Sequence, residues 1–305
     1  MSLFGVYIHW PFCASKCPYC DFNSHVREKI DEDAWRSAYA REISHYASLT
    51  PGRVVTSVFF GGGTPSLMSP ATVEAVMTAV RKGWKIDPAV EITLEANPGT
   101  VEAARFEAYR DAGINRLSLG IQSFNDGHLK ALGRIHSADE ARRAIATAQD
   151  YFDNFNLDLM FGLSGQTTEQ ALLDLQTAMN CNPTHLSWYQ LTIEPETPFY
   201  ALHRAGKLQT PDESLARALY DVTQQTCAEL GLPAYEISNH ARPGAECRHN
   251  LVYWRGQEYA GIGPGAHGRL DIGGVRHAIA TERRPESWLM RVEACGHGVV
   301  TDDLL

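Results

Sequence analysis

Three cysteines near the start of the chain have the spacing of a metal-binding loop. The run reads Cys13-Ala-Ser-Lys-Cys17-Pro-Tyr-Cys20, and thiolates are soft ligands suited to iron–sulfur clusters or to zinc. Three thiolates on a four-iron cluster leave one iron open for a small molecule. A structural zinc site would instead need a fourth ligand, available from His9, Asp21, His25 or a distant cysteine. On spacing alone, both metals remain open.

Composition favours a metal site in a reducing compartment. The chain has 305 residues and seven cysteines, an odd number with three members in one run, which suits a ligand set better than a disulfide framework. The formal net charge of -9 disfavours nucleic acid as the main partner, because that affinity depends on clustered Lys and Arg. No signal peptide or membrane-length apolar run is recognised, so we expect a cytoplasmic protein without a transmembrane segment.

Further polar residues follow other apolar runs. The turn Gly61-Gly62-Gly63-Thr64-Pro65 would let the backbone approach a ligand closely, with the Thr64 hydroxyl nearby. Glu95 ends an otherwise apolar strand, where an unpaired carboxylate is costly, so it is expected to meet a ligand or a cation. An ion pair with Arg134 is the structural alternative.

The elements that position these residues alternate between strands and helices. Six short β-branched and aromatic runs predict parallel strands, at Val6 to His9, Val54 to Phe60, Val90 to Glu95, Arg116 to Gly120, Phe155 to Met160 and His185 to Gln190. Amphipathic segments between them predict helices, at Asp33 to Ser48, Pro70 to Val80, Val101 to Ala112, Ala138 to Ala148 and Thr168 to Met179.

Repeated βα units predict an α/β fold, a partial (β/α)6 TIM-like barrel in which the polar candidates share the rim at the carboxyl ends of the strands. After about Pro195 the pattern changes to a helix around Glu213 to Leu230 and a Gly- and His-rich stretch. We therefore expect a barrel over residues 1–195, carrying the site, and an extension of mixed α/β structure over residues 196–305.

The cysteine run, the glycine turn and the phrase Tyr7-Ile8-His9-Trp10-Pro11-Phe12-Cys13 together resemble the radical S-adenosylmethionine (SAM) superfamily, and within it the oxygen-independent coproporphyrinogen III oxidase family. The resemblance implies a [4Fe–4S] cluster on Cys13, Cys17 and Cys20. Matched motif by motif, it implies SAM contacts at Tyr7, Gly62, Gly63, Thr64, Glu95, Gln122, Arg134 and Asp158.

Two departures favour the haem chaperone (HemW) branch of that family over the oxidases. The oxidases carry a further Cys where this chain has Phe22, and they have an N-terminal extension ahead of the barrel. The HemW-type signature His-Asn-x-x-Tyr-Trp is present instead, and it implies candidate haem contacts at Cys247, His249, Asn250, Tyr253 and Trp254. The alternative is structural, with Tyr253 and Trp254 in the core and His249 bonded to a backbone carbonyl.

The implied function is a chaperone that binds haem and passes it to haem-accepting proteins. The first alternative is an enzyme, a coproporphyrinogen III oxidase that decarboxylates propionate side chains by radical chemistry. A weaker one is radical modification of RNA. The sequence names no catalytic residue and leaves open whether the chain is an enzyme. Family members generally continue into a smaller helical domain, whereas this sequence stops at Leu305.

Overall fold

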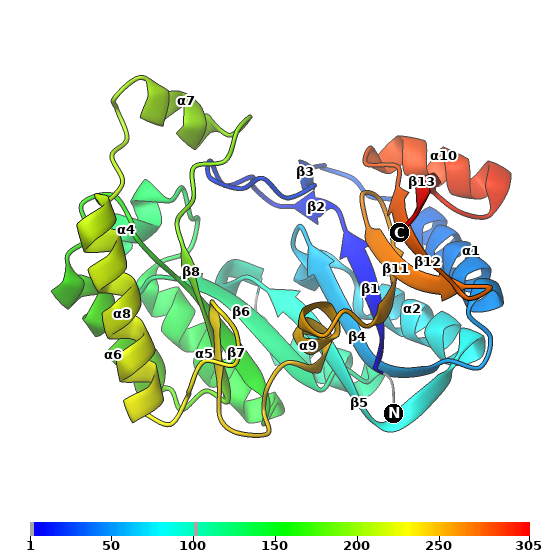
Figure 1. The fold of residues 1–305 in the computed structure, drawn as a ribbon, viewed down its shortest axis with the longest axis horizontal. Helices are drawn as coiled ribbons and strands as arrows, with labels where there is room; N and C mark the ends of the chain where they lie inside the picture. Colours follow the sequence, from blue (N-terminus) through cyan, green and yellow to red (C-terminus); the bar gives the residue numbers. More distant parts are fainter. Residues whose placement is uncertain (1–2, 101–102) are drawn as a thin grey trace.

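One large sheet organises the molecule. The computed structural model describes residues 3–100 and 103–305, and eleven of the described strands form a single sheet in the order β13-β12-β11-β10-β1-β4-β5-β6-β7-β8-β9. The stretch from β10 to β8 is parallel throughout, and the strands outside it at both ends are antiparallel. This is the curved, partly open sheet of an incomplete barrel (Figure 1).

The six predicted strands are all confirmed, in sequential order across the sheet. They are β1 (Phe4–Trp10), β4 (Val54–Gly62), β5 (Lys85–Ala96), β6 (Arg116–Gln122), β7 (Phe155–Phe161) and β8 (His185–Gln190). Strand β5 begins five residues before the predicted Val90, because Lys85 and Ile86 pair with the start of β4 ahead of a shift in register. Short strands β2 (Phe12–Cys13) and β3 (His25–Val26) pair separately and hold the two ends of the cysteine loop.

The connecting helices cover one face of the sheet (Figure 1). They are α1 (Glu32–Leu49), α2 (Pro70–Gly83), α3 (Ala103–Ala112), α5 (Ala138–Tyr151) and α6 (Thr168–Asn180), with the short α4 (Asp126–Ala131) after β6. Residues 101 and 102 of the predicted third helix lie outside the described residues. The helices begin where capping chemistry predicts: Ser137 and Thr167 each form a complete capping box at α5 and α6.

The chain after residue 195 extends the same sheet at both edges. Helices α7 (Pro198–Arg204) and α8 (Glu213–Glu229) lead to β9 (Asn239–Ala241) beside β8, and α9 (Arg248–Trp254) then crosses to the far edge. There β10 (Glu258–Ile262) pairs in parallel with β1, followed by β11 (His267–Ile272), β12 (Val275–Thr281), α10 (Pro285–Cys295) and β13 (Val299–Leu304). The division at residue 195 stays a prediction, because it marks a change of sequence pattern rather than an observed boundary.

A continuous apolar core fills the space between the sheet and the helices. Along α1, Trp35, Tyr39, Ile43 and Tyr46 recur at helical spacing and are all buried. Trp35 stacks on Trp288 of α10, with ring centroids 5.2 Å apart, so the last helix is packed against the first. Among the described residues, no helix combines the length and apolar character needed to cross a membrane.

Candidate functional site

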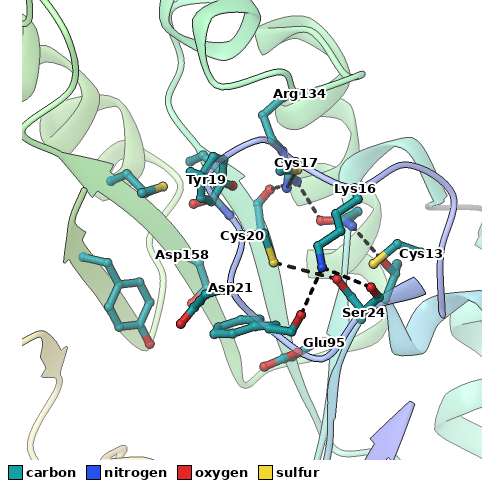
Figure 2. A pocket seen from close by; sticks show the side chains of 18 of the residues that line it. Cys13, Lys16, Cys17, Tyr19, Cys20, Asp21, Ser24, Glu95, Arg134 and Asp158 are labelled. Atoms are coloured by element: carbon teal, nitrogen blue, oxygen red, sulfur yellow. Dashed lines mark hydrogen bonds between the residues drawn. The ribbon is translucent and has the colours of Figure 1, made fainter. Parts of the chain in front are cut away.

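The three cysteines project from one loop into a cavity of about 530 Å³. The loop leaves β2 and returns at β3, and the Lys16 ammonium donates to the backbone carbonyl of Ser24 at 3.2 Å across it. Figure 2 shows the thiols of Cys13, Cys17 and Cys20 around this space, with the carboxylates of Glu95 and Asp158 on the strand side. The cavity lies at the carboxyl ends of the strands, as predicted.

All the cluster and SAM candidates except Tyr7 line this cavity. Its walls include Cys13, Cys17, Cys20, Gly62, Gly63, Thr64, Glu95, Gln122, Arg134 and Asp158. The structure therefore brings together residues that lie up to about 145 positions apart in the sequence.

Each cysteine sulfur has its own polar neighbour. The Thr64 hydroxyl donates to Cys13 Sγ at 3.4 Å, an Arg134 N–H donates to Cys17 Sγ at 3.7 Å, and Cys20 Sγ lies 3.9 Å from the Ser24 hydroxyl. Burial raises the pKa of the Cys13 and Cys20 thiols. Hydrogen-bond donors around thiolates are what a cysteine-ligated cluster requires to balance its negative charge, so the residues present fit a [4Fe–4S] cluster.

The residues proposed as a fourth zinc ligand either have other hydrogen-bond partners or do not converge with the cysteines on one point. Both ring nitrogens of His9 have protein partners, the Tyr7 hydroxyl and the Asn23 carbonyl oxygen, each at 2.9 Å. His25 Nε2 lies 3.2 Å from the Asn23 side-chain oxygen. In the described part of the chain, no three His, Cys, Asp or Glu side chains converge closely enough to hold a single metal ion.

The glycine turn packs against the start of the cysteine loop. The Gly63 N–H donates to the Trp10 carbonyl at 2.7 Å and the Thr64 N–H to the Phe12 carbonyl at 2.8 Å. A Cβ on Gly62, where φ is 110°, would lie 2.5 Å from the His9 ring, and a Cβ on Gly63 would lie 2.6 Å from the Phe12 carbonyl oxygen. These glycines are therefore required for close backbone contact between the two loops that frame the site.

Two carboxylates share the cavity wall. Glu95, at the end of β5, accepts from the Gly62 N–H at 3.2 Å, and burial together with the nearby Asp158 charge raises its pKa to about 8. Asp158 accepts from the Ser118 hydroxyl at 3.0 Å and the Asn156 amide at 2.7 Å, and burial raises its pKa as well. A pair of recessed carboxyl groups is suited to binding the vicinal hydroxyls of a ribose.

The structure does not support the proposed ion pair between Glu95 and Arg134. The Arg134 guanidinium donates to the Asn97 side-chain oxygen at 2.6 Å and to the Gly120 carbonyl at 2.8 Å, in addition to Cys17. Gln122, two residues beyond Gly120, has a φ of 68° at a register shift between β6 and β7. Left-handed backbone at a non-glycine residue is costly and concentrates at ligand sites, which supports the assignment of Gln122 to this site.

Tyr7 lies in an adjoining cavity of about 150 Å³. This smaller cavity shares four wall residues with the larger one, namely Glu95, Ser118, Asp158 and Tyr189. The Tyr7 ring stacks near Phe59 and His249, with centroids 6.4 and 6.3 Å away, and its hydroxyl reaches His9. Tyr7 thus connects the smaller cavity to the strand that leads into the cysteine loop.

The candidate haem residues lie on and beside α9, and all of them except Trp254 line that smaller cavity. His249 is 2% exposed, with Nδ1 at 2.9 Å from the Ser57 hydroxyl and Nε2 at 2.7 Å from the Tyr253 hydroxyl. Cys247 is buried and its pKa is raised to about 12, mainly by burial. By contrast, Tyr253 is 41% and Trp254 52% exposed. The motif therefore presents two aromatic side chains outward and keeps its histidine bonded inside.

Asn250 also faces inward, and its amide donates to the Tyr235 hydroxyl at 3.0 Å. Sequence reasoning did not assign Tyr235, nor Asn97 and Ser118 in the larger cavity wall. The sequence did contain a signal for Asn97 and Ser118. Asn97 follows Glu95 by two residues at a strand end, which favours the same face, and Ser118 is a polar residue inside a buried strand, where it needs a partner.

Comparison with known proteins gives the same assignment. Residues 7–177 match the family model described as the radical SAM superfamily. The chain is 45% identical over 282 residues to the haem chaperone HemW of Escherichia coli strain K12, covering 92% of this chain and 74% of that protein. It is 42% identical over 299 residues to the mitochondrial radical S-adenosyl methionine domain-containing protein 1 of Bos taurus, covering 96% and 68%.

Among solved structures, the coproporphyrinogen III oxidase HemN of Escherichia coli, a radical SAM enzyme, superimposes with a TM-score of 0.84 at 24% identity. The match covers 100% of this chain and 72% of that one. At this identity the structural likeness establishes a shared fold, whereas the sequence matches place the chain in the HemW branch of the superfamily. The chain belongs to the radical SAM superfamily and, within it, to the HemW family.

Proposed function

We propose that this protein is a HemW-type haem chaperone, which binds haem and passes it to haem-accepting proteins while a [4Fe–4S] cluster and SAM support the transfer. The observation that carries the proposal is the 45% identity to a protein of that name over nearly the whole chain. Bound on Cys13, Cys17 and Cys20, the cluster would supply an open iron position for SAM. A cytoplasmic location remains a prediction.

We infer that haem contacts α9 through its exposed aromatic side chains. Tyr253 lines the smaller cavity, Trp254 follows it at the end of α9, and both are half-exposed. Flat aromatic rings suit the face of a porphyrin. Iron ligation by His249 would require it to give up its bond to Ser57 or to Tyr253. Ligation by Cys247 would require a buried thiol with a pKa of about 12 to lose its proton.

The test is a haem titration of anaerobically purified protein, reconstituted with iron and sulfide and followed by absorption spectroscopy. The parent is expected to bind haem saturably, and Trp254→Ala to bind about tenfold more weakly, the effect of losing roughly 1.4 kcal/mol of aromatic contact. Met290→Ala, which alters an exposed apolar residue on α10, serves as the control and should bind like the parent.

A Cys13→Ala variant should lose the cluster absorption. A cluster in the parent without saturable haem binding would contradict the chaperone proposal and favour the oxidase alternative. That alternative is then examined directly by assaying porphyrinogen turnover under anaerobic, reducing conditions. A His249→Ala variant with undiminished haem affinity would remove His249 from the haem contacts without affecting the proposal as a whole.

A further inference from the structure

A chain of hydrogen bonds joins two of the cluster cysteines along the wall of the larger cavity. It runs from Cys13 Sγ to the Thr64 hydroxyl at 3.4 Å, from there to the Asn97 amide nitrogen at 3.0 Å, from the Asn97 amide oxygen to Arg134 at 2.6 Å, and from Arg134 to Cys17 Sγ at 3.7 Å. Asn97 is the middle member and the only one without a role among the predicted site residues.

Donor and acceptor chemistry fixes the direction of every bond in this chain. Arginine can only donate, so the amide oxygen of Asn97 must face Arg134 and its NH₂ group must face Thr64. Because Thr64 Oγ1 accepts from that NH₂ group, its own proton is free to point at Cys13 Sγ. Asn97 thereby orients both donors toward sulfur.

We propose that Asn97 is a positioning residue that sets the reduction potential of the cluster by aiming Thr64 at Cys13 and Arg134 at Cys17. Hydrogen bonds to cysteine sulfurs stabilise the reduced, more negative cluster and so raise its potential. The inference rests on the family's cluster being held by these cysteines. It concerns the cluster rather than haem, so the two proposals fail independently.

Three substitutions separate the contact of Asn97 with Thr64 from its contact with Arg134. Asn97→Asp keeps an acceptor for Arg134 but can no longer donate to Thr64, whose proton would turn from Cys13 to the new carboxylate. Asn97→Ala removes both contacts without adding charge. Thr64→Val removes the donor to Cys13 directly, with little change in shape.

The experiment is a redox titration of anaerobically reconstituted protein without SAM, following the reduced cluster by electron paramagnetic resonance. N97A, N97D and T64V are each expected to lower the midpoint potential. The effect of N97A should be smaller in the T64V background than in the parent, because the hydrogen bond from Thr64 to Cys13 is already missing there. N97D should retain a part of its shift in that background, owing to its added charge.

Equal shifts for N97A with and without T64V, or no shift at all, would overturn the proposal. Iron content and far-ultraviolet circular dichroism report whether a variant folds and carries its cluster. If N97A fails to assemble the cluster, the N97D and T64V pair carries the test, because N97D keeps the acceptor toward Arg134. Haem titration of N97A, expected to match the parent, separates this outcome from the chaperone proposal.

Discussion

At the scale of single residues, the site is a set of polar groups held out of water by an apolar sheet. Burial, and then the charge of the nearby Asp158, raise the pKa of Glu95 to about 8. Neither is neutralised by Arg134, whose guanidinium is directed to Asn97, Gly120 and Cys17. Such a pair is expected to prefer a ligand that donates hydrogen bonds, because those bonds stabilise the charged form of the carboxylates.

This predicts that SAM affinity depends on pH through Glu95. In the free protein its pKa is about 8, and ribose hydroxyls would bind its ionised form, so binding releases a proton and the affinity rises with pH up to about 8. The expected slope approaches tenfold per pH unit below that value. Equilibrium dialysis of the reconstituted protein between pH 6 and 9 measures it.

Glu95→Gln, which cannot ionise, should bind SAM more weakly at pH 8 and lose this slope. An identical pH profile in parent and variant would show that another group is responsible.

At the scale of elements, the sequence predicted the strands with local patterns and missed those that depend on distant partners. The six runs rich in β-branched residues all became parallel strands. Strand β10 was not predicted, because Glu258–Ile262 is short and contains Gly261. It forms by pairing with β1 on one side and β11 on the other. The hairpin of β11 and β12 had a readable signal in the dipeptide Gly273-Gly274, and both glycines have positive φ in the turn that joins the two strands.

The site shows the same division. Motif positions identified the three cysteines and seven predicted SAM contacts that the structure brings to one cavity, because these residues are recognised by their own spacing. By contrast, the hydrogen bonds of Asn97 to Thr64 and Arg134 and the contacts of buried His249 depend on which strands and helices pack together. His249 contacts Ser57, which is 192 positions away in sequence, and no local pattern predicts that meeting.

One such meeting of elements involves Glu42, a fully buried carboxylate on α1. It accepts from the backbone N–H groups of Gly263 and Gly298 at 2.7 Å each and from the Trp288 indole. Glu42→Ala leaves these donors without an acceptor and is expected to lower the free energy of unfolding by about 2 kcal/mol or more. Urea unfolding of the apoprotein measures the loss.

The pH dependence has a defined sign. Burial raises the Glu42 pKa to about 7, so the folded protein binds this proton more tightly than the unfolded chain does. The stabilisation from that tighter binding is fully present below the ordinary carboxyl pKa near 4.5 and is lost as pH rises through 7. The stability of Glu42→Gln relative to the parent should therefore increase between pH 5 and 8. A constant difference would show that Glu42 does not titrate in this window.

At the scale of the whole molecule, the cluster loop contacts segments that lie far along the sequence. The Asn23 amide group donates to the Pro264 carbonyl at 2.9 Å and to the Arg283 carbonyl at 2.8 Å, while the Asn23 carbonyl accepts from His9. The loop that carries the cysteines is thus held by residues about 240 to 260 positions further along.

Asn23→Ala should release this loop while leaving the sheet intact. Alkylation of Cys17 and Cys20 in the apoprotein is expected to become about 5- to 150-fold faster. Loss of the Asn23 side-chain contacts to Pro264, Arg283 and His25 lowers the cost of local opening by roughly 1–3 kcal/mol. Mass spectrometry of iodoacetamide-treated protein measures the rates site by site. Buried Cys227 on α8 is the internal control, and faster labelling of Cys227 too would indicate global unfolding instead.

The place of β10 beside β1 has a consequence for the order of events during synthesis. Strand β1 is made about 250 residues before its neighbour at residues 258–262, and the anchors at Pro264 and Arg283 follow later still. At about 5–20 residues per second, roughly 10 to 50 seconds separate them. Throughout that interval the cysteine loop lacks the two hydrogen bonds from Asn23 to these carbonyls, so the fully anchored site exists only once residue 283 has been made.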